Sequence, residues 1–433
     1  MDVAVLGCGW AGALLAYSLA ERYSVVCLEK EERPGGLLRS ETLRGFTVDV
    51  GGSHVIFSRD RVALDGMLGL LEGNVISRER ESYVELGGAL VPYPFENGLY
   101  ALPPNDRAEA LVSFVEALLS LNEGWVPKNL EEWIKGFFGK WIAERYLIPY
   151  NRKVWKRSLD TIDVDWIYTP GRLPIPDWRD VLRSAAGVPT RGYIEQATFY
   201  YPLRGGIEAL HKGALERARR RGAVFITRAP VRNIVRGDGR LVVNGLVEAK
   251  KIVSTIPLPE LVEALDEQLK ADLTDLAKRF DHNRVVTVAV ALVGEAPPHH
   301  WVYVPDERVV FHRYAWLSNY SPYNAPPGAS LVLAEVSVPP GAYVERGLAD
   351  RVVRDLERAG VIEGREVIAT RAWVNDYGYP IHSIGLREVR ERVLEYLRGL
   401  GIFSVGRWGE WRYLNMDAVM RRVEQVSGEF FYC

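Results

Sequence analysis

Cysteine is scarce in this chain, and its distribution argues against two kinds of site. The 433 residues include three cysteines, Cys8, Cys27 and Cys433, and none of them forms a C-x-x-C or C-x-x-x-C pair. This spacing provides neither a zinc site nor a disulfide framework. We therefore expect reduced thiols and a cytoplasmic location.

Long apolar runs and excess charge are also missing. The most apolar run, "VVTVAVALVG" (residues 285–294), is rich in β-branched residues and far shorter than the ~20 residues of a membrane span. We expect a buried strand there and no membrane span. The start, "MDVAVLGCGWAG", lacks the basic segment of a signal peptide. A net charge of −2 gives no electrostatic footprint for nucleic acid.

Lysine is rare beside arginine. Of the 54 basic residues 11 are lysine, which leaves 43 arginines, and four methionines accompany 24 prolines. These numbers favour a heat-adapted (thermophile) source, although genomic base composition also shifts arginine usage. The length predicts two or three domains.

A dinucleotide-binding unit opens the chain. Residues 2–6, "DVAVL", read as a strand, "ALLAYSLAER" as a helix, and "SVVCLEK" as a second strand that ends in an acid. Between the first strand and the helix, Gly7, Gly9 and Gly12 form G-x-G-x-x-G. These glycines allow a tight turn, close approach of a pyrophosphate, and helix–strand packing. Glu29 can accept the ribose hydroxyls.

Further glycine pairs distinguish FAD from NAD as the cofactor. "EKEERPGGLLRS" (29–40) carries Gly36 and Arg39, and "DVGGSHVIF" (49–57) carries Gly51 and Gly52. Such segments are typical of the FAD family that includes amine oxidases, protoporphyrinogen oxidases, Rab GDP-dissociation inhibitors and UDP-galactopyranose mutases. "VSTIP" (253–257) and "GRWG" resemble other FAD segments of that family. The remaining cofactor residues that the resemblance implies are Val231, Gly406, Met416 and Asp417, the last at a helix start that would face the flavin.

The middle of the chain contains two regions with different sequence patterns. Residues 103–200 are mainly helical, with N-caps expected at Asn129 and Asp177 and an apolar stripe of Leu111, Val115, Leu118 and Leu119. Strands dominate residues 285–380. We expect an α/β protein with a Rossmann-like FAD-binding domain of the glutathione-reductase and amine-oxidase type, a helical domain and an antiparallel β-sheet substrate domain. The expected boundaries are 1–75, 200–284 and 385–433 for FAD binding, 100–199 for the helical domain, and 76–99 with 285–384 for the sheet.

The sheet segments resemble UDP-galactopyranose mutases, especially the eukaryotic type. "RYAWLSNYSPYN" (313–324) with "HWVYVP" ten residues upstream carries most of the resemblance. Further matching segments follow the family order over nearly the whole chain: "VPYPFENGLYALP", "YNRKVW", "QATFYYPLRGG", "YGYP" and "GRWGEWRYLNMD".

The resemblance assigns substrate roles residue by residue. Arg313 resembles a diphosphate arginine, Arg407 would lie near sugar and flavin, and His54 resembles a histidine whose loop moves with the flavin redox state. The other substrate-binding positions implied are Asn151, Trp155, Gln196, Trp301, Tyr303, Tyr320, Tyr379 and Tyr413. Arginines bind a diphosphate through paired hydrogen bonds, and aromatic faces suit uracil and sugar. Singly, such tyrosines and tryptophans are more often packing residues, and an arginine beside a tyrosine is often a surface contact.

Three positions depart from the family pattern. Ser53 stands inside "GGSH", where the family has glycine or proline before the histidine. Pro170 occupies the place of the second diphosphate arginine, and Arg172 lies two residues later. We expect Arg172 to act as the second clamp. The tail "YLNMD" is closer to the bacterial pattern.

The resemblance implies an isomerase, an intramolecular transferase acting on a nucleotide sugar. In the family, N5 of reduced flavin attacks the anomeric carbon, UDP leaves, and the sugar recloses to interconvert UDP-galactopyranose and UDP-galactofuranose without net redox. The flavin then needs a reductant such as NAD(P)H. The exact sugar and the oligomeric state stay open.

Two rival functions share the FAD segments. A flavin oxidoreductase of the amine or protoporphyrinogen oxidase type would bind an amine or apolar substrate, and it gives the arginine and tyrosine strands no task. A non-catalytic binding protein like the GDP-dissociation inhibitors predicts a degraded glycine motif, which the intact Gly7, Gly9 and Gly12 argue against.

Overall fold

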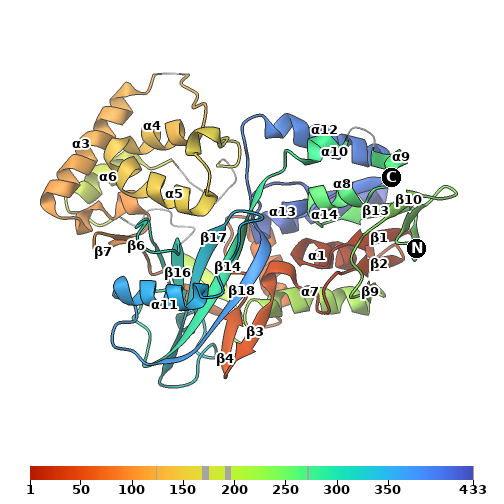
Figure 1. Cartoon of the computed structure of the whole chain (residues 1–433), viewed down its shortest axis with the longest axis horizontal. Coiled ribbons are helices and arrows are strands. Elements are labelled where there is room, and N and C mark those ends of the chain that lie inside the picture. The colour runs from red at the N-terminus through yellow and green to blue at the C-terminus, as the bar shows by residue number, and fades with distance from the viewer. Residues whose placement is uncertain (123, 168–174, 191–196, 271–272, 433) are drawn as a thin grey trace.

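The computed structural model describes residues 1–122, 124–167, 175–190, 197–270 and 273–432. Figure 1 shows a helical region (α3 to α6), a central antiparallel region (β14, β16, β17, β18), and a parallel-sheet region where both termini lie. Strands from residues 3–28, 224–254 and 402–404 combine in the parallel sheet. This mixed architecture confirms the expected fold class. The domain boundaries stay a prediction.

The parallel sheet has five strands in the order β19-β13-β1-β2-β9, and every neighbouring pair is parallel. Its side chains alternate between two cores. Val3 and Val5 of β1 face α1, α7 and α14, whereas Ala4 and Leu6 face α8 and α12 on the other side. The elements are β1 (Val3–Leu6), β2 (Val25–Leu28), β9 (Val224–Ile226), β13 (Lys251–Ser254), β19 (Ile402–Ser404), α1 (Trp10–Leu19), α7 (Glu208–Arg220), α8 (Leu258–Ala264), α12 (Leu386–Gly399) and α14 (Met416–Tyr432).

Smaller elements complete this region. A three-stranded antiparallel sheet, a β-hairpin (β3 with β4) and a second antiparallel pair (β5 with β8) accompany the parallel sheet. They comprise β10 (Ile234–Arg236), β11 (Leu241–Val243), β12 (Val247–Ala249), β3 (Ser40–Leu43) with β4 (Phe46–Asp49), β5 (Ile76–Glu79) with β8 (Thr198–Tyr201), α2 (Arg61–Leu70), α9 (Glu267–Lys270), α10 (Leu273–Ala277), α13 (Gly406–Gly409), and the 3₁₀ turn η1 (Gly36–Leu38).

The central sheet has seven strands in the order β18-β14-β17-β16-β15-β6-β7. All neighbours are antiparallel except β15 and β6. One face packs on α11, and the other face joins the core of the parallel-sheet region. The elements are β6 (Ser82–Leu86), β7 (Ala89–Pro92), β14 (His282–Val293), β15 (Trp301–Tyr303), β16 (Arg313–Trp316), η7 (Leu317–Asn319), β17 (Ala329–Val338), α11 (Leu348–Arg358) and β18 (Val367–Pro380). The buried strand expected at 285–294 is confirmed in β14.

The helical region contains α3 (Pro104–Ser120), α4 (Leu130–Ile142), a π-helical turn (Ala143–Leu147), α5 (Ile148–Trp155), α6 (Trp178–Ala185) and the 3₁₀ turns η2 (Phe95–Asn97), η3 (Leu99–Ala101) and η5 (Leu159–Thr161). Both predicted caps are confirmed, because Asn129 and Asp177 accept backbone N–H groups of the first turn. The apolar stripe on α3 is wrong: Leu119 is 80% exposed. The helix instead buries Ala110 and Phe114.

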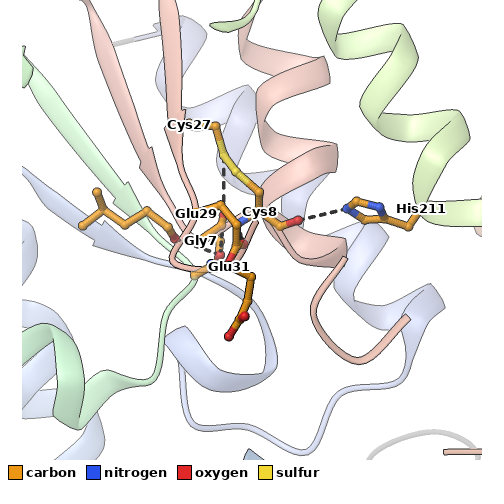
Figure 2. Close-up of a disulfide and its surroundings, with 8 residues drawn as sticks. Gly7, Cys8, Cys27, Glu29, Glu31 and His211 are labelled. Carbon is orange, nitrogen blue, oxygen red and sulfur yellow. Dashed lines mark hydrogen bonds between the residues drawn. A yellow bond between two sulfur atoms is a disulfide. The ribbon is translucent and has the colours of Figure 1, made fainter. Parts of the chain in front are cut away.

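Cys8 and Cys27 form a disulfide, which corrects the expectation of reduced thiols (Figure 2). Val5 of β1 lies opposite Cys27 of β2. Cys8 lies two residues after the end of β1, and its Cα is 6.4 Å from that of Cys27. Strand pairing, which cysteine spacing does not report, brings the two thiols together. The cytoplasmic expectation thereby loses one of its supports.

Among the residues that the structure describes, no helix is long and apolar enough to cross a bilayer.

Candidate functional site

The β1–α1 turn is shaped by its glycines. Gly7 has φ +85°, and a Cβ on Gly12 would lie 1.9 Å from the Gly7 carbonyl oxygen. Helix and strand therefore approach more closely than any side chain allows at position 12. Gly9 caps α1 without a side-chain hydrogen bond, so the first N–H groups of the helix face outward.

Glu29 closes the other side of this turn. Its carboxylate accepts the N–H of Cys8 at 2.9 Å and the N–H of Glu31 at 3.0 Å, and the residue is buried. Each carboxylate oxygen keeps a second acceptor position for a ligand hydroxyl. His211 bonds the Cys8 carbonyl from the opposite side at 2.9 Å (Figure 2).

Two later glycine segments face the turn. A Cβ on Gly36 would lie 3.3 Å from the Cα of Gly9, so two bare backbones oppose each other. Arg39 donates to the Gly36 carbonyl at 3.2 Å. A Cβ on Gly51 would lie 2.0 Å from the Leu37 carbonyl oxygen. Gly9, Gly36 and Gly51 therefore border a cradle whose surface is backbone rather than side chain.

The start of α14 borders the same cradle. Trp10 donates its indole N–H to the Met416 carbonyl at 2.9 Å, and Ser58 donates to the Asp417 carboxylate at 2.6 Å. A Cβ on Gly406 would lie 2.8 Å from the Cβ of Ala11. Val231 is half-buried on the segment after β9. The predicted cofactor residues from the C-terminal segment thus lie beside the β1–α1 turn.

A row of polar residues crosses the central sheet. Tyr303, Arg313, Glu335 and Thr287 are successive cross-strand partners on β15, β16, β17 and β14. Thr287 donates its hydroxyl to the carbonyl of Val50 at 2.7 Å. The row therefore runs directly to the loop that carries Gly51, Gly52 and His54, the cradle-side loop.

Glu335 was not identified from the sequence, although it is the one charged residue of β17. Its two oxygens each accept Nη2 of Arg313 at 2.7 Å, and Oε1 also accepts the hydroxyl and N–H of Ser53 at 2.8 and 3.1 Å. Burial opposes the charged form, but Arg313 and these donors hold the pKa of Glu335 at about 2. The carboxylate is ionised.

The histidines of the site are neutral. Burial lowers the pKa of His54 to about 4, against the attraction of Glu335, and lowers the pKa of His312 to about 3. His54 Nδ1 lies 3.0 Å from the Gly52 carbonyl, which orients the ring. The positive charge among these residues therefore comes from Arg313 and Arg407.

An aromatic cluster lies beside Arg407. The rings of Tyr379 and Tyr413 stack at 5.9 Å with an interplanar angle of 4°. Trp155 meets both rings edge-on, and the Arg407 guanidinium carbon lies 4.3 Å from the centroid of Tyr413. Asn151 accepts the Trp155 indole N–H at 2.9 Å, so one turn of α5 fixes the tryptophan.

Tyr320 and Trp301 lie in a second aromatic group, with Phe199 and Tyr201. Burial raises the pKa of Tyr320, whose hydroxyl lies near Ser53. Tyr303 packs against Tyr150 at 5.5 Å. Tyr150 was another residue missed from the sequence. Two predicted substrate residues, Arg172 and Gln196, lie outside the described residues, as does Pro170.

Two segments of the chain match known protein families. Residues 5–65 match the NAD(P)-binding Rossmann-like domain, and residues 171–382 match the flavin-containing amine oxidoreductases. A crystal structure of reduced UDP-galactopyranose mutase superposes with a TM-score of 0.88 at 25% identity, over 100% of this chain and 94% of that chain. The chain belongs to the amine oxidase-like superfamily of FAD proteins.

Other superfamily members share the fold alone. A putative protoporphyrinogen oxidase from Exiguobacterium superposes with a TM-score of 0.75 at 19% identity, covering 99% of this chain and 98% of that one. Cyclohexylamine oxidase from Brevibacterium oxydans superposes with a TM-score of 0.67 at 12% identity, covering 99% of each chain.

FAD is the cofactor of this superfamily protein, and the cradle fits it. The opposed backbones of Gly9 and Gly36 leave room for a pyrophosphate, the outward N–H groups of α1 attract its charge, and Glu29 keeps acceptor positions for ribose hydroxyls. The start of α14 would place positive helix-end potential near the ring system.

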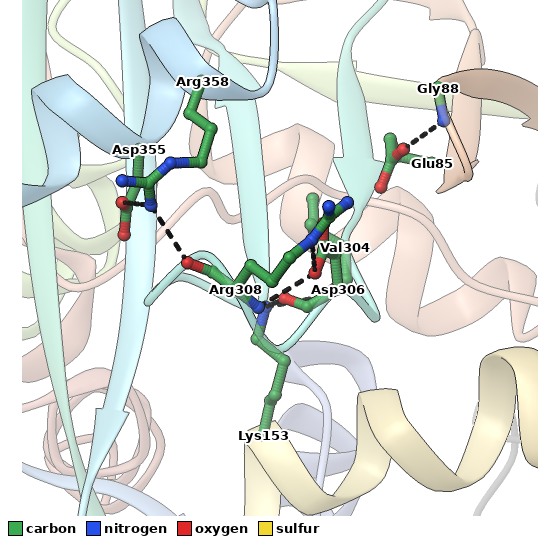
Figure 3. A network of polar contacts seen from close by, with 8 residues as sticks. All are labelled: Glu85, Gly88, Lys153, Val304, Asp306, Arg308, Asp355 and Arg358. Atoms are coloured by element: carbon green, nitrogen blue, oxygen red, sulfur yellow. Dashed lines mark hydrogen bonds and ion pairs between the residues drawn. The ribbon is translucent and has the colours of Figure 1, made fainter.

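A buried lysine connects the helical region to the central sheet region (Figure 3). Lys153 of α5 donates to the carbonyls of Val304 and Asp306 at 3.0 and 2.6 Å. It is 5% exposed, and burial lowers its pKa to about 7. The contact fixes α5, which carries Asn151 and Trp155, against the segment after β15.

Proposed function

We propose that this FAD protein is a UDP-galactopyranose mutase, which interconverts UDP-galactopyranose and UDP-galactofuranose without net redox. The observation that carries the proposal is the polar row of β15 to β14, with Arg313 at its centre and next to the cradle-side loop. An amine or apolar substrate has no use for the half-buried guanidinium of Arg313. A nucleotide diphosphate does, because its charge needs bidentate donors.

Arg313 and Arg407 would hold the diphosphate. The Nε atoms of both side chains are buried and lack a hydrogen-bond partner among the described residues. Buried donors of this kind call for an acceptor, and the phosphate oxygens of UDP would supply it. Because negative charge on UDP grows as the glycosidic bond breaks, these contacts strengthen toward the transition state.

The aromatic cluster would orient the rest of the substrate. Tyr379, Tyr413 and Trp155 offer flat faces with polar tips, which suit a uracil ring or a sugar face. Reduced FAD, when bound, supplies the electron-rich centre that lets the sugar exchange its bond to UDP. Neutral His54 can accept or donate one hydrogen bond there without adding charge.

The proposed site also includes two residues that lie outside the part of the chain described by the structure. Arg172 would be the second diphosphate arginine, and Gln196 would contact the substrate. Arg172→Ala should raise KM for UDP-galactofuranose strongly with a smaller change in kcat. An unchanged KM would remove Arg172 from the site. A cytoplasmic location, an NAD(P)H-type reductant and a heat-adapted source are also part of the proposal.

Conversion by the reduced enzyme tests the function. FAD-loaded protein is reduced with dithionite and incubated with UDP-galactofuranose, and UDP-galactopyranose is followed by chromatography. We expect conversion only after reduction. No conversion, together with amine-driven oxygen uptake by the oxidised protein, would favour the oxidoreductase alternative.

A further inference from the structure

Glu335 places a full negative charge inside the anion-binding part of the site. Its side chain is 2% exposed, and an ionised carboxylate at such a position needs paired donors to persist. The donors are Arg313 from β16 and Ser53 from the cradle-side loop. A buried pair of this kind is weak evidence of stabilisation, so its role must lie elsewhere.

The charges around Arg313 do not balance a diphosphate. Arg313 and Arg407 are positive, His54 and His312 are neutral, and Glu335 is negative. These described residues therefore carry one net positive charge, whereas the diphosphate of a nucleotide sugar is a dianion. Without the charge of Glu335, the two would match.

We propose that Glu335 is a built-in counterion of Arg313 that competes with the substrate's diphosphate for the guanidinium and thereby sets the anion selectivity of the site. The inference rests on the proposed function and deepens it. Glu335 acts through Arg313, so it is a specificity-determining positioning residue and not a catalytic one.

The hydrogen bonds explain how the competition works. Glu335 takes Nη2 of Arg313 with both oxygens, while Nε of Arg313 is buried without a partner among the described residues. The Arg313 side chain is 23% exposed, so a phosphate oxygen can approach its other N–H groups while Glu335 stays bonded to Nη2. Because Ser53 holds Oε1 through its hydroxyl and its N–H, the carboxylate is fixed and the two anions face each other across one guanidinium.

Selectivity follows from this arrangement. A small anion such as inorganic pyrophosphate meets the repulsion of Glu335 and gains no other contact. A nucleotide sugar meets the same repulsion, but its contacts with the rings of Trp155, Tyr379 and Tyr413 add favourable binding energy that offsets it. The counterion therefore favours ligands that carry both a diphosphate and flat groups.

Glu335→Gln is the decisive variant, because the amide oxygen can still accept from Arg313 and Ser53 while the charge is gone. Titration calorimetry on oxidised, FAD-loaded protein measures Kd for UDP, uridine and pyrophosphate. We expect UDP to bind about tenfold more tightly, uridine to be unchanged, and pyrophosphate binding to become measurable, since one like charge near a dianion has been removed.

Two matched variants separate charge from geometry. Glu335→Asp keeps the charge and should not tighten UDP binding. Asp355→Asn removes the charge of another buried carboxylate, which pairs with the exposed Arg358 on α11, and should leave the UDP affinity within about twofold.

Ser53→Ala provides a test that spares the buried charge pair itself. It removes one donor from Oε1, so the carboxylate is less neutralised and should weaken UDP binding by about two- to threefold. The inference is overturned if Glu335→Gln weakens UDP binding, if UDP and uridine shift equally, or if Ser53→Ala tightens UDP binding. A wild-type protein that converts UDP-galactofuranose while Glu335→Gln leaves Kd unchanged would sink this inference alone. A wild-type protein that binds no UDP would overturn both.

Discussion

The FAD cradle and the polar row of the central sheet are built in different ways, although each places polar groups where an anion could bind. The cradle uses backbone: Gly9 and Gly36 oppose each other, and α1 presents N–H groups. The polar row uses side chains, with Arg313 held by Glu335. A backbone site carries partial charges and needs no counterion, whereas a buried arginine does. The cradle should therefore be most sensitive to added side-chain volume, and the polar row should be most sensitive to changes of charge.

The largest effect should come from filling the cradle. Gly12→Val places side-chain atoms where a Cβ already lies 1.9 Å from the Gly7 carbonyl oxygen, so the turn must open. We expect loss of bound FAD, measured by the flavin absorbance per protein. Gly428→Ala is the control, because a Cβ there meets nothing within 4 Å. It should keep FAD and gain up to ~1 kcal/mol. Full flavin occupancy in Gly12→Val would contradict the backbone account.

Acid should be the next largest perturbation, and it should act mainly on the sheet side. Burial lowers the pKa of four histidines there, His54, His299 and His300 to about 4 and His312 to about 3, and that of His211 beside the cradle to about 4. Between pH 6.5 and 4 the unfolded chain binds more protons, so the free energy of unfolding should fall as pH falls through this window.

One carboxyl group has the opposite effect on the pH dependence of the free energy of unfolding. Burial raises the pKa of Asp49 to about 6, so the folded protein gains a proton there as pH falls. One such group does not offset five imidazoles. Urea unfolding at several pH values measures the slope, and His211→Gln should reduce it by about one proton. A flat profile from pH 6.5 to 4.5 would show that the rings are not held neutral.

Arg313→Ala should break the side-chain site and spare the cradle. We expect UDP affinity and kcat/KM to fall by about 100-fold, in the range for loss of a charged hydrogen-bonding group, with FAD content unchanged. Arg308→Ala is the matched control, since Arg308 is 81% exposed and pairs with Asp306. Loss of FAD from Arg313→Ala would mean that the two sites are not separable.

The smallest effect concerns the lysine that joins α5 to the sheet. Burial lowers the pKa of Lys153 from 10.5 to about 7. Above pH 7 the unfolded chain therefore binds more protons, and wild type should gain stability over Lys153→Met as pH rises. Below pH 7 the difference should be constant. Exposed Lys140→Met serves as the control, with a difference that does not change with pH. Urea unfolding at about pH 6, 8 and 9.5 compares the variants.

The sequence predicted geometry that is local in the chain and missed geometry that depends on strand pairing. Gly7, Gly9, Gly12 and Glu29 lie within one βαβ unit, so their spacing predicts their geometry. Glu335 becomes part of the site because β17 pairs with β16 in a particular register. A single charge in "ASLVLAEVSV" was the available signal, since an apolar strand rarely buries a charge without a partner.

The other misses have the same cause. Leu118 and Leu119 fit a helical stripe on α3, but the neighbours of α3 cover Ala110 and Phe114 instead. The pairing of Cys8 with Cys27 depends on the parallel register of β1 and β2. Periodicity gives one face of a helix or strand without saying which element covers it.

The disulfide has a mechanical consequence for the chain. Because Cys8 and Cys27 are separated by 19 positions, the segment between them cannot extend when the two termini are pulled apart. A stretched chain should fall short of its full contour length by about 60 Å, at ~3.5 Å per residue. Adding a dithiol reductant to the stretched molecule should release that length in a single step, once unfolding has exposed the bond.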